Sequence, residues 1–115
     1  MIVELVTFRA TPGADWDSIL TEARATIPRW RGNAQLVRKH YLLSEDGTQC
    51  AGLYVWPTRA AAEAAHDAAW RASVEARTGS PPEFRYFDLQ MLLDNETGTV
   101  TEWSRSGEKS IRSLP

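Results

Sequence analysis

The sequence contains a single cysteine, no long hydrophobic run and no excess of one charge. Because Cys50 has no second cysteine to pair with, no internal disulfide can form, which is typical of proteins from a reducing compartment. No window approaches the roughly 18 uninterrupted apolar residues of a membrane span, and charges at Glu4 and Arg9 interrupt the apolar start, unlike in a signal peptide. The net charge is -2, with acidic and basic residues interspersed. We therefore expect a cytoplasmic protein that binds neither nucleic acid nor membranes.

Recognised catalytic motifs are absent as well. The chain has no glycine-rich nucleotide-binding loop, no Gly-x-Ser-x-Gly elbow and no His-Glu-x-x-His sequence. Its two histidines, His40 and His66, have no second ligand at the spacing of a metal site. We therefore expect no metal, no nucleotide and no other cofactor, so any chemistry must come from side chains that the fold brings together.

What the sequence does contain is sufficient for one folded domain. The apolar fraction of 43% and the charged fraction of 24% are those of an ordinary globular protein, and 115 residues can bury a core without disulfides. After residue 95, glycine, serine, threonine and charged residues dominate. We predict a folded domain over residues 1–95 and a tail over residues 96–115, which either docks on the body or a partner subunit or is a tag-like extension.

The hydropathy pattern predicts six elements in the domain. Runs of β-branched and aromatic residues predict strands, and Asp46-Gly47 predicts the turn of a hairpin. Apolar residues three and four apart predict two helices, the first ended by Pro28 and the second capped by Thr58. The order strand, helix, strand, strand, helix, strand is typical of a ferredoxin-like α+β fold, in which two helices cover one face of a four-stranded antiparallel sheet. The predicted strands cover residues 2–9, 37–43, 49–56 and 84–93, and the predicted helices cover residues 15–26 and 58–77.

The alternation of the third strand predicts which sheet face meets the helices. Ala51, Leu53 and Val55 are small or aliphatic and suit packing against the alanine-rich second helix, so we assign them to the helix side. The aromatic set then covers the open face, and it exceeds the apolar area that monomers usually expose. Two copies packed sheet to sheet would cover it, so we predict a homodimer in which the space between the two sheets is a shared or paired small-molecule cavity. The aromatic set is Phe8, Tyr54, Trp56, Phe84 and Tyr86.

Polar residues in the second strand are the candidates for chemistry. In the run Arg38-Lys39-His40-Tyr41, alternation sends two side chains to each face. One interpretation is an edge strand whose charges face solvent and discourage edge pairing. The other is that Lys39 or His40 enters a pocket as a proton acceptor or oxyanion partner, and we take these two as candidate catalytic residues. Candidate substrate-binding residues, each of which also suits simple packing, are Phe8, Tyr54, Trp56, Trp70, Tyr86 and Asp88.

Several segments of the chain resemble a known family. The resemblance covers about residues 1–95 and is to the monooxygenases of the dimeric α+β barrel superfamily, the antibiotic biosynthesis monooxygenase-like proteins. It implies the ferredoxin-like fold and the sheet-to-sheet dimer. It also implies oxygenation of a small phenolic, quinol or polyketide-like ring without a cofactor. The segments that carry it are Leu36–Leu42, Ser44–Gly47, Ala51–Trp56, Thr58–Ala62, Trp70 and Tyr86–Asp88.

Cofactor-independent oxygenation makes a definite demand on the pocket. Ground-state oxygen is a triplet and reacts slowly with closed-shell organic molecules unless the substrate first becomes an electron-rich anion. The protein must therefore remove a proton and stabilise the anion in a dry cavity. Lys39 or His40 would supply the base in this interpretation.

Other functions remain open at this point. The chain could be a dimeric small-molecule binder or a structural protein without catalysis, or an isomerase of the same superfamily. The haem-degrading branch is disfavoured, because the register places Thr7, Ala65 and Val74 where its asparagine, tryptophan and histidine would stand.

Overall fold

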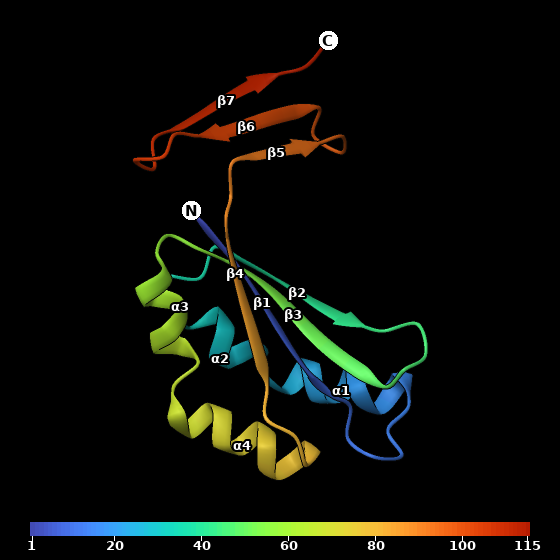
Figure 1. The fold of residues 1–115 in the computed structure, drawn as a ribbon. Helices are drawn as coiled ribbons and strands as arrows, with labels where there is room; N and C mark the ends of the chain where they lie inside the picture. The colour runs from blue at the N-terminus through green and yellow to red at the C-terminus, as the bar shows by residue number, and fades with distance from the viewer.

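The structure is a computed structural model that describes all 115 residues. A four-stranded antiparallel sheet has the order β2-β3-β1-β4, and the helices lie on one side of it (Figure 1). This arrangement confirms the predicted ferredoxin-like α+β fold. None of the helices has the length and apolar character needed to cross a membrane. The elements of this body are β1 (Ile2–Arg9), α1 (Trp16–Ala25), α2 (Ile27–Arg31), β2 (Arg38–Leu43), β3 (Gln49–Trp56), α3 (Arg59–Ala65), α4 (Ala68–Thr78) and β4 (Glu83–Asp88).

The β2–β3 hairpin and the start of α3 form where the sequence predicts them. The Asp46 carboxylate accepts hydrogen bonds from the Thr48 backbone at 3.0 Å and from the Thr48 and Ser44 hydroxyls at 2.7 Å. These bonds, the Thr48 hydroxyl first, lower the pKa of Asp46 to about 2. Gly47 follows with a φ of 74°, which favours glycine. Thr58 caps α3 by accepting from the Ala61 N–H at 3.1 Å.

The helices differ from the prediction in two places. The first helix ends at Ala25 as predicted, but Ile27–Arg31 then forms the short helix α2 with Pro28 in its first turn, where a missing N–H costs nothing. The prediction of one continuous helix over residues 58–77 is wrong. His66 leaves helical geometry with φ −106° and ψ 60°, and Asp67 caps a new helix by accepting from the Trp70 N–H. An aspartate that competes for a backbone N–H favours a helix start over a helix interior.

The predicted last strand over residues 84–93 also divides. Strand β4 ends at Asp88, and the chain then leaves the body to form β5 (Met91–Asp94), which pairs with β6 (Thr99–Trp103) and through it with β7 (Lys109–Ser113). We call residues 91–113 the arm. The predicted boundary between residues 95 and 96 falls in the turn between β5 and β6, so the predicted tail is part of a second sheet.

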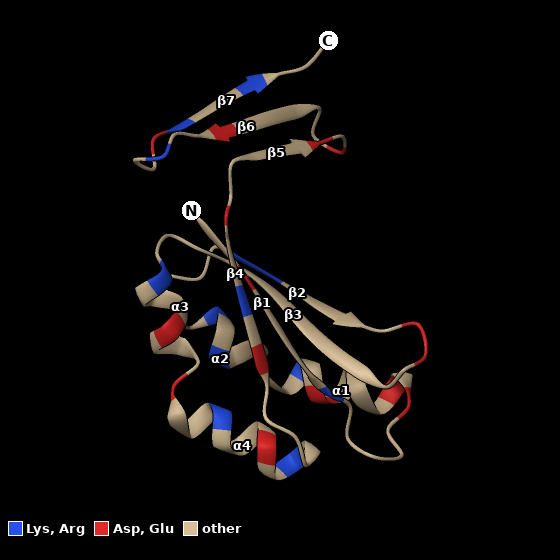
Figure 2. Ribbon diagram, viewed as in Figure 1, with Lys and Arg blue, Asp and Glu red and all other residues tan.

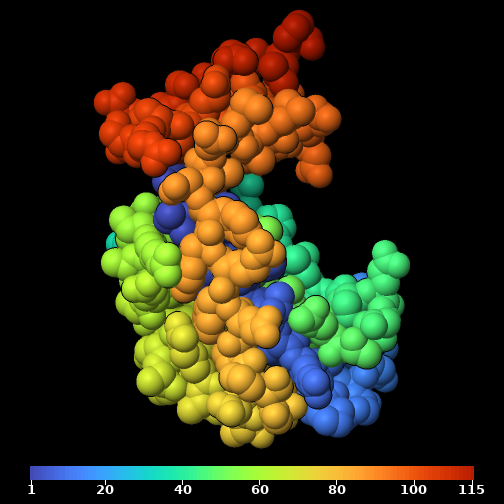
Figure 3. All heavy atoms as spheres, viewed as in Figure 1, coloured from blue at the N-terminus to red at the C-terminus, as the bar shows by residue number.

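The arm stands apart from the body, beyond one end of the four-stranded sheet (Figure 1). The molecule is therefore long, with extents of 47 × 29 × 23 Å and a radius of gyration of 15.8 Å. A compact chain of this length would have a radius of about 13 Å. Figure 3 shows a hollow between the arm and the β2–β3 hairpin. The arm buries Val100 and Thr101 but contributes no residue to the core cluster of the body.

The predicted assignment of the sheet faces is wrong. Tyr54 and Trp56 are buried on the helix side, where they pack with Val6, Trp30 and Ala62 in the core. The small alanine side chains of α3 leave space between the helix and the sheet. The large rings of Tyr54 and Trp56 fill this space, which the small residues of β3 could not do. The open face carries the alternate residues, the aliphatic and basic ones. They are Val3, Leu5, Arg38, His40, Leu42, Ala51, Leu53, Val55, Arg85 and Phe87.

Candidate functional site

A cavity of about 400 Å³ lies between helices α1, α2 and α4 and the sheet. Helix α1 has its apolar residues at helical spacing, and Ile19 and Ala23 border the cavity, yet no residue of α1 is buried. An amphipathic helix normally buries its apolar face against the protein. The unfilled space beneath α1 therefore marks the cavity as a candidate ligand site. Its apolar wall includes Phe8, Ile19, Ala23, Trp30, Tyr54, Trp70 and Val74.

Lys39 places its side-chain amine at the wall of this pocket. Its Nζ lies 4.0 Å from the ring centre of Tyr41, 4.5 Å from that of Trp30 and 4.7 Å from that of Tyr54. No carboxylate forms an ion pair with it. Burial, and then the positive charge of Arg29, lower the pKa of Lys39 to about 7, while the three aromatic faces favour the charged form and oppose this shift. A substantial share of the Lys39 side chains is thus an uncharged amine near neutral pH.

Two further cations and one acid border the pocket. Arg29 donates from Nη2 to the Ala65 carbonyl at 3.0 Å and lies against the Trp30 ring, 5.1 Å from its centre. At another part of the wall, Arg77 Nη1 lies 3.9 Å from Glu22 Oε2. Cys50 is half-buried in the same wall, and burial followed by the charge of Glu22 raises the pKa of its thiol. The pocket is therefore apolar with a cationic side at Arg29 and Lys39.

The two tyrosines beside Lys39 are fixed by their neighbours. The Tyr41 hydroxyl hydrogen-bonds to the Thr26 hydroxyl at 2.8 Å. Tyr54 lies over Gly52, where an added Cβ would be 2.6 Å from Cε1 of the tyrosine ring. Burial, and then the charge of Glu4, raise the pKa of Tyr54, so its hydroxyl stays protonated. A side chain at position 52 would therefore displace the Tyr54 ring, which lies next to the Lys39 amine.

A buried polar cluster lies behind the pocket wall. Trp56 donates from Nε1 to Glu4 Oε1 at 2.9 Å, and His66 Nδ1 lies 3.0 Å from the same oxygen. The imidazole is not aligned for a hydrogen bond with this oxygen, and neither of its ring nitrogens has a hydrogen-bond partner. The His66 ring packs 4.4 Å from Trp70 and 4.7 Å from Tyr54. The Glu4–His66 pair therefore supports two rings that form the pocket wall.

Four of the eight predicted site residues border the pocket. Lys39 and Tyr54 lie at its cationic side, and their strands pair at this point in the register. Trp70 enters from α4, where the helix break at His66 positions it. Phe8 completes the wall from the end of β1.

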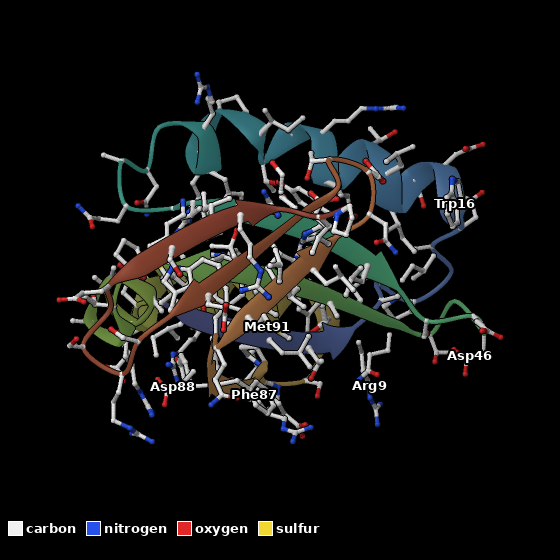
Figure 4. All side chains as sticks on the ribbon, turned by 90° about the horizontal axis from the view of Figure 1, so that it is seen from above. Arg9, Trp16, Asp46, Phe87, Asp88 and Met91 are labelled. Atoms are coloured by element: carbon white, nitrogen blue, oxygen red, sulfur yellow. The ribbon has the colours of Figure 1, made fainter.

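The other four lie elsewhere. His40 is exposed on the open face, because it alternates with Lys39 along β2. Trp56 belongs to the core. Tyr86 is half-buried under the Arg59 guanidinium, 4.1 Å away, and burial followed by the charge of Glu4 raises its pKa to about 12. Asp88 is exposed at the end of β4 beside Phe87 (Figure 4).

Sequence reasoning missed several residues around the pocket. Arg29 and Trp30 were not predicted at the pocket, because Pro28 indicated a loop where a short helix forms, and Trp30 was expected only to pack from that loop. Tyr41 could have been found, since it shares the strand face of Lys39. Glu4 could also have been identified from the sequence, because a carboxylate in an apolar central strand needs a polar partner when it is buried. No three His, Cys, Asp or Glu side chains are grouped closely enough to bind a metal ion.

Comparison with known structures defines the class of fold. No protein-family model and no curated protein matches the chain. A structure of an antibiotic biosynthesis monooxygenase is 15% identical with a TM-score of 0.61, over 77% of this chain and 98% of the other. The chain therefore has the fold of the antibiotic biosynthesis monooxygenases, as the sequence resemblance predicts.

Two of the similar structures come from Streptomyces. The monooxygenase from the gene ActVA-Orf6 of Streptomyces coelicolor, solved with nanaomycin D, is 20% identical with a TM-score of 0.61, over 77% of this chain and 87% of the other. SnoaB, a cofactor-independent oxygenase from Streptomyces nogalater, was solved as a mutant. It is 20% identical with a TM-score of 0.56, over 80% of this chain and 96% of the other.

Proposed function

We propose that the protein is a cofactor-independent monooxygenase that acts on a small phenolic, quinol or polyketide-like ring. The observation that carries the proposal is the position of the Lys39 amine, which lies among three aromatic rings at the wall of an apolar pocket and has no ion-pair partner. The fold, shared with SnoaB and the ActVA-Orf6 monooxygenase, supports it. The single, half-buried Cys50 suits the reducing cytoplasm, where we place the protein.

Lys39 acts first as the general base. Its uncharged amine takes the proton of the phenol or enol and becomes an ammonium, which pairs with the anion that forms. The rings of Trp30, Tyr41 and Tyr54 stabilise that ammonium, so the proton transfer is helped by the same groups that enclose the amine. Arg29 adds a positive charge on the same side. The electron-rich substrate anion then reacts directly with oxygen.

Replacing Lys39 by methionine is expected to lower oxygen uptake by about 10²–10⁴-fold, because the chain length is kept and the base is lost. Uptake is measured with an oxygen electrode and a panel of quinols. His40→Ala is the matched control, because His40 is the next residue of the same strand but lies on the other face. Equal uptake by the wild type and Lys39→Met would remove Lys39 as the base, and quinol binding without uptake would favour a small-molecule binding protein.

We also propose that two copies form a homodimer through the open face. Strand β3 in the middle of this face carries no charged residue (Figure 2), and aliphatic residues of β1 and β3 pair across it. The arm stands beyond one end of the sheet and leaves the hollow seen in Figure 3. In this arrangement the open face of one subunit is covered by the other, and the arm docks on the partner. Each pocket stays between the helices and the sheet of its own subunit.

Phe87→Glu is expected to convert the dimer into a folded monomer. Phe87 is 46% exposed and pairs with Val3 on the open face, so a carboxylate there would be buried without a partner in the dimer. The control is Trp16→Glu, because Trp16 is 68% exposed on α1, far from Phe87 (Figure 4). Light scattering should give a dimer mass for the wild type and Trp16→Glu. A monomeric wild type at micromolar concentration would contradict the proposal.

A further inference from the structure

We propose that Lys39 is also an amine nucleophile, which forms an imine with an aldehyde or ketone group of the molecule that occupies the pocket. The imine does not involve oxygen, so this inference goes beyond the proposed monooxygenase and can hold or fail independently of it. Three features support it, namely the placement of the amine, its charge state and the shape of the ligand that the pocket accepts.

The placement of Lys39 suits a nucleophile. Its Nζ lies among the rings of Trp30, Tyr41 and Tyr54 at the wall of the cavity, where the ligand has access to it. Most structural lysines near a protein surface pair with a carboxylate or point into water. Lys39 does neither, because it is partly buried and none of the ion pairs of the molecule includes it. Its lone pair is thus free to attack a bound molecule.

The charged and titratable neighbours of Lys39 keep part of the amine uncharged. Arg29 from α2 repels the ammonium, and the apolar wall removes water from it, so the pKa lies at about 7. Desolvation and an adjacent cation are the two ways in which proteins activate a lysine as a nucleophile. The facing titratable groups from β2 and β3 are Tyr41 and Tyr54, and neither supplies a negative charge while protonated. Glu22, Cys50 and Arg77 border the same cavity.

The reaction itself needs no group that the pocket lacks. The Lys39 nitrogen forms a bond to the carbonyl carbon, and the carbonyl oxygen takes up a proton to give a carbinolamine. This hydroxyl then takes a second proton and leaves as water while the C=N bond forms. The first proton comes from the attacking amine nitrogen and the second from solvent. The nitrogen of the C=N bond then returns its remaining N–H proton to solvent, so no proton is consumed overall and no electron donor or acceptor is needed.

The remaining pocket residues define the ligand class. Rings of Phe8, Trp30 and Trp70 favour an aromatic body. Arg29 has N–H groups beyond the one bound to Ala65, which suits a carboxylate or phenolate on the ligand. The volume of about 400 Å³ accepts one small ring system. We therefore expect an aromatic aldehyde or ketone that also carries an acidic group.

Reductive trapping tests the proposal. The wild-type protein is incubated at pH 7 with 4-formylbenzoate and sodium cyanoborohydride, whose hydride reduces the imine to a stable secondary amine. The chain has only two lysines, Lys39 and Lys109, so peptide mapping assigns the adduct directly. Lys109 is exposed on β7 and does not border the pocket that would hold the aldehyde. We expect modification of Lys39 to be at least about tenfold faster than that of Lys109.

Controls separate this result from ordinary amine labelling. Lys109→Met should leave trapping at Lys39 unchanged, whereas Lys39→Arg keeps the positive charge and should abolish the fast phase. Benzaldehyde, which lacks the carboxylate, should react more slowly with Lys39 than 4-formylbenzoate does. Equal labelling of the two lysines, or labelling of the N-terminal amine alone, would overturn the proposal. Trapping at Lys39 without oxygen uptake from quinols would uphold the imine and reject the monooxygenase.

Discussion

Replacing His66 by leucine is expected to lower the free energy of unfolding by about 3–5 kcal/mol, because the change removes the imidazole that lies against the buried Glu4 carboxylate and leaves that carboxylate with one polar neighbour fewer. Glu4 and His66 are both inaccessible to solvent, so water cannot take the place of the lost imidazole. Only the Trp56 N–H would remain to satisfy the carboxylate. The measurement is urea unfolding followed by tryptophan fluorescence at neutral pH.

A double-mutant cycle tests the reason for this loss. The variant Glu4→Leu/His66→Leu removes both partners, so it should recover most of the stability lost in His66→Leu. Glu63→Gln is the matched control, because Glu63 pairs with Arg59 on the exposed surface, and its loss should cost under about 1 kcal/mol. If the double variant were as unstable as the sum of the two single variants, the two side chains would not be coupled.

Trp30→Ala is expected to have an effect of similar size, with a loss of about 3–5 kcal/mol in the free energy of unfolding. Trp30 is buried and packs against Tyr54 at 5.1 Å and His66 at 5.2 Å between ring centres. The cavity left by the indole would also admit water to Lys39. Desolvation is the main cause that lowers the pKa of Lys39, so this pKa should rise towards its ordinary value.

Both effects of Trp30→Ala can be measured on one sample. Urea unfolding gives the stability, and NMR titration of labelled lysine side chains follows the pKa values, with only Lys39 and Lys109 to resolve. Trp16→Ala is the control, because Trp16 is exposed on α1 and its loss should change the stability by under about 0.5 kcal/mol. An unchanged Lys39 titration in a folded Trp30→Ala protein would show that the indole does not keep water from the amine.

Local signals in the sequence predicted the framework of the fold well. The turn at Asp46-Gly47 and the cap at Thr58 depend on hydrogen bonds within a few residues, so their geometry is set locally. The break at His66 was missed because the alanines on both sides favour helix, and only the Asp67 cap decides against it. The direction of β5 was missed for another reason. Its residues suit a strand in either sheet, and pairing with β6, the next strand along the chain, decides which.

The candidate site could be predicted only in part. Alternation along β2 separates Lys39 from His40, but it does not say which of them meets the helices. That depends on which face of β3 packs against α3. We expected the small residues of β3 to face the alanines of this helix, but Tyr54 and Trp56 do so instead. Arg29 and Trp30 reach the pocket through the short helix α2, whose Pro28 suggested a loop. Contacts between distant elements therefore define the site more than any local motif does.

Helix α1 gains little from the rest of the protein, because none of its residues is buried and the space below it is the cavity. A molecule seated in that cavity would touch Ile19 and Ala23 on one side and the sheet on the other. For this helix such a molecule would take the place that core side chains hold elsewhere in the molecule. Binding of a ligand would therefore also complete the packing under α1, and we expect it to stabilise α1 more than any other part of the molecule.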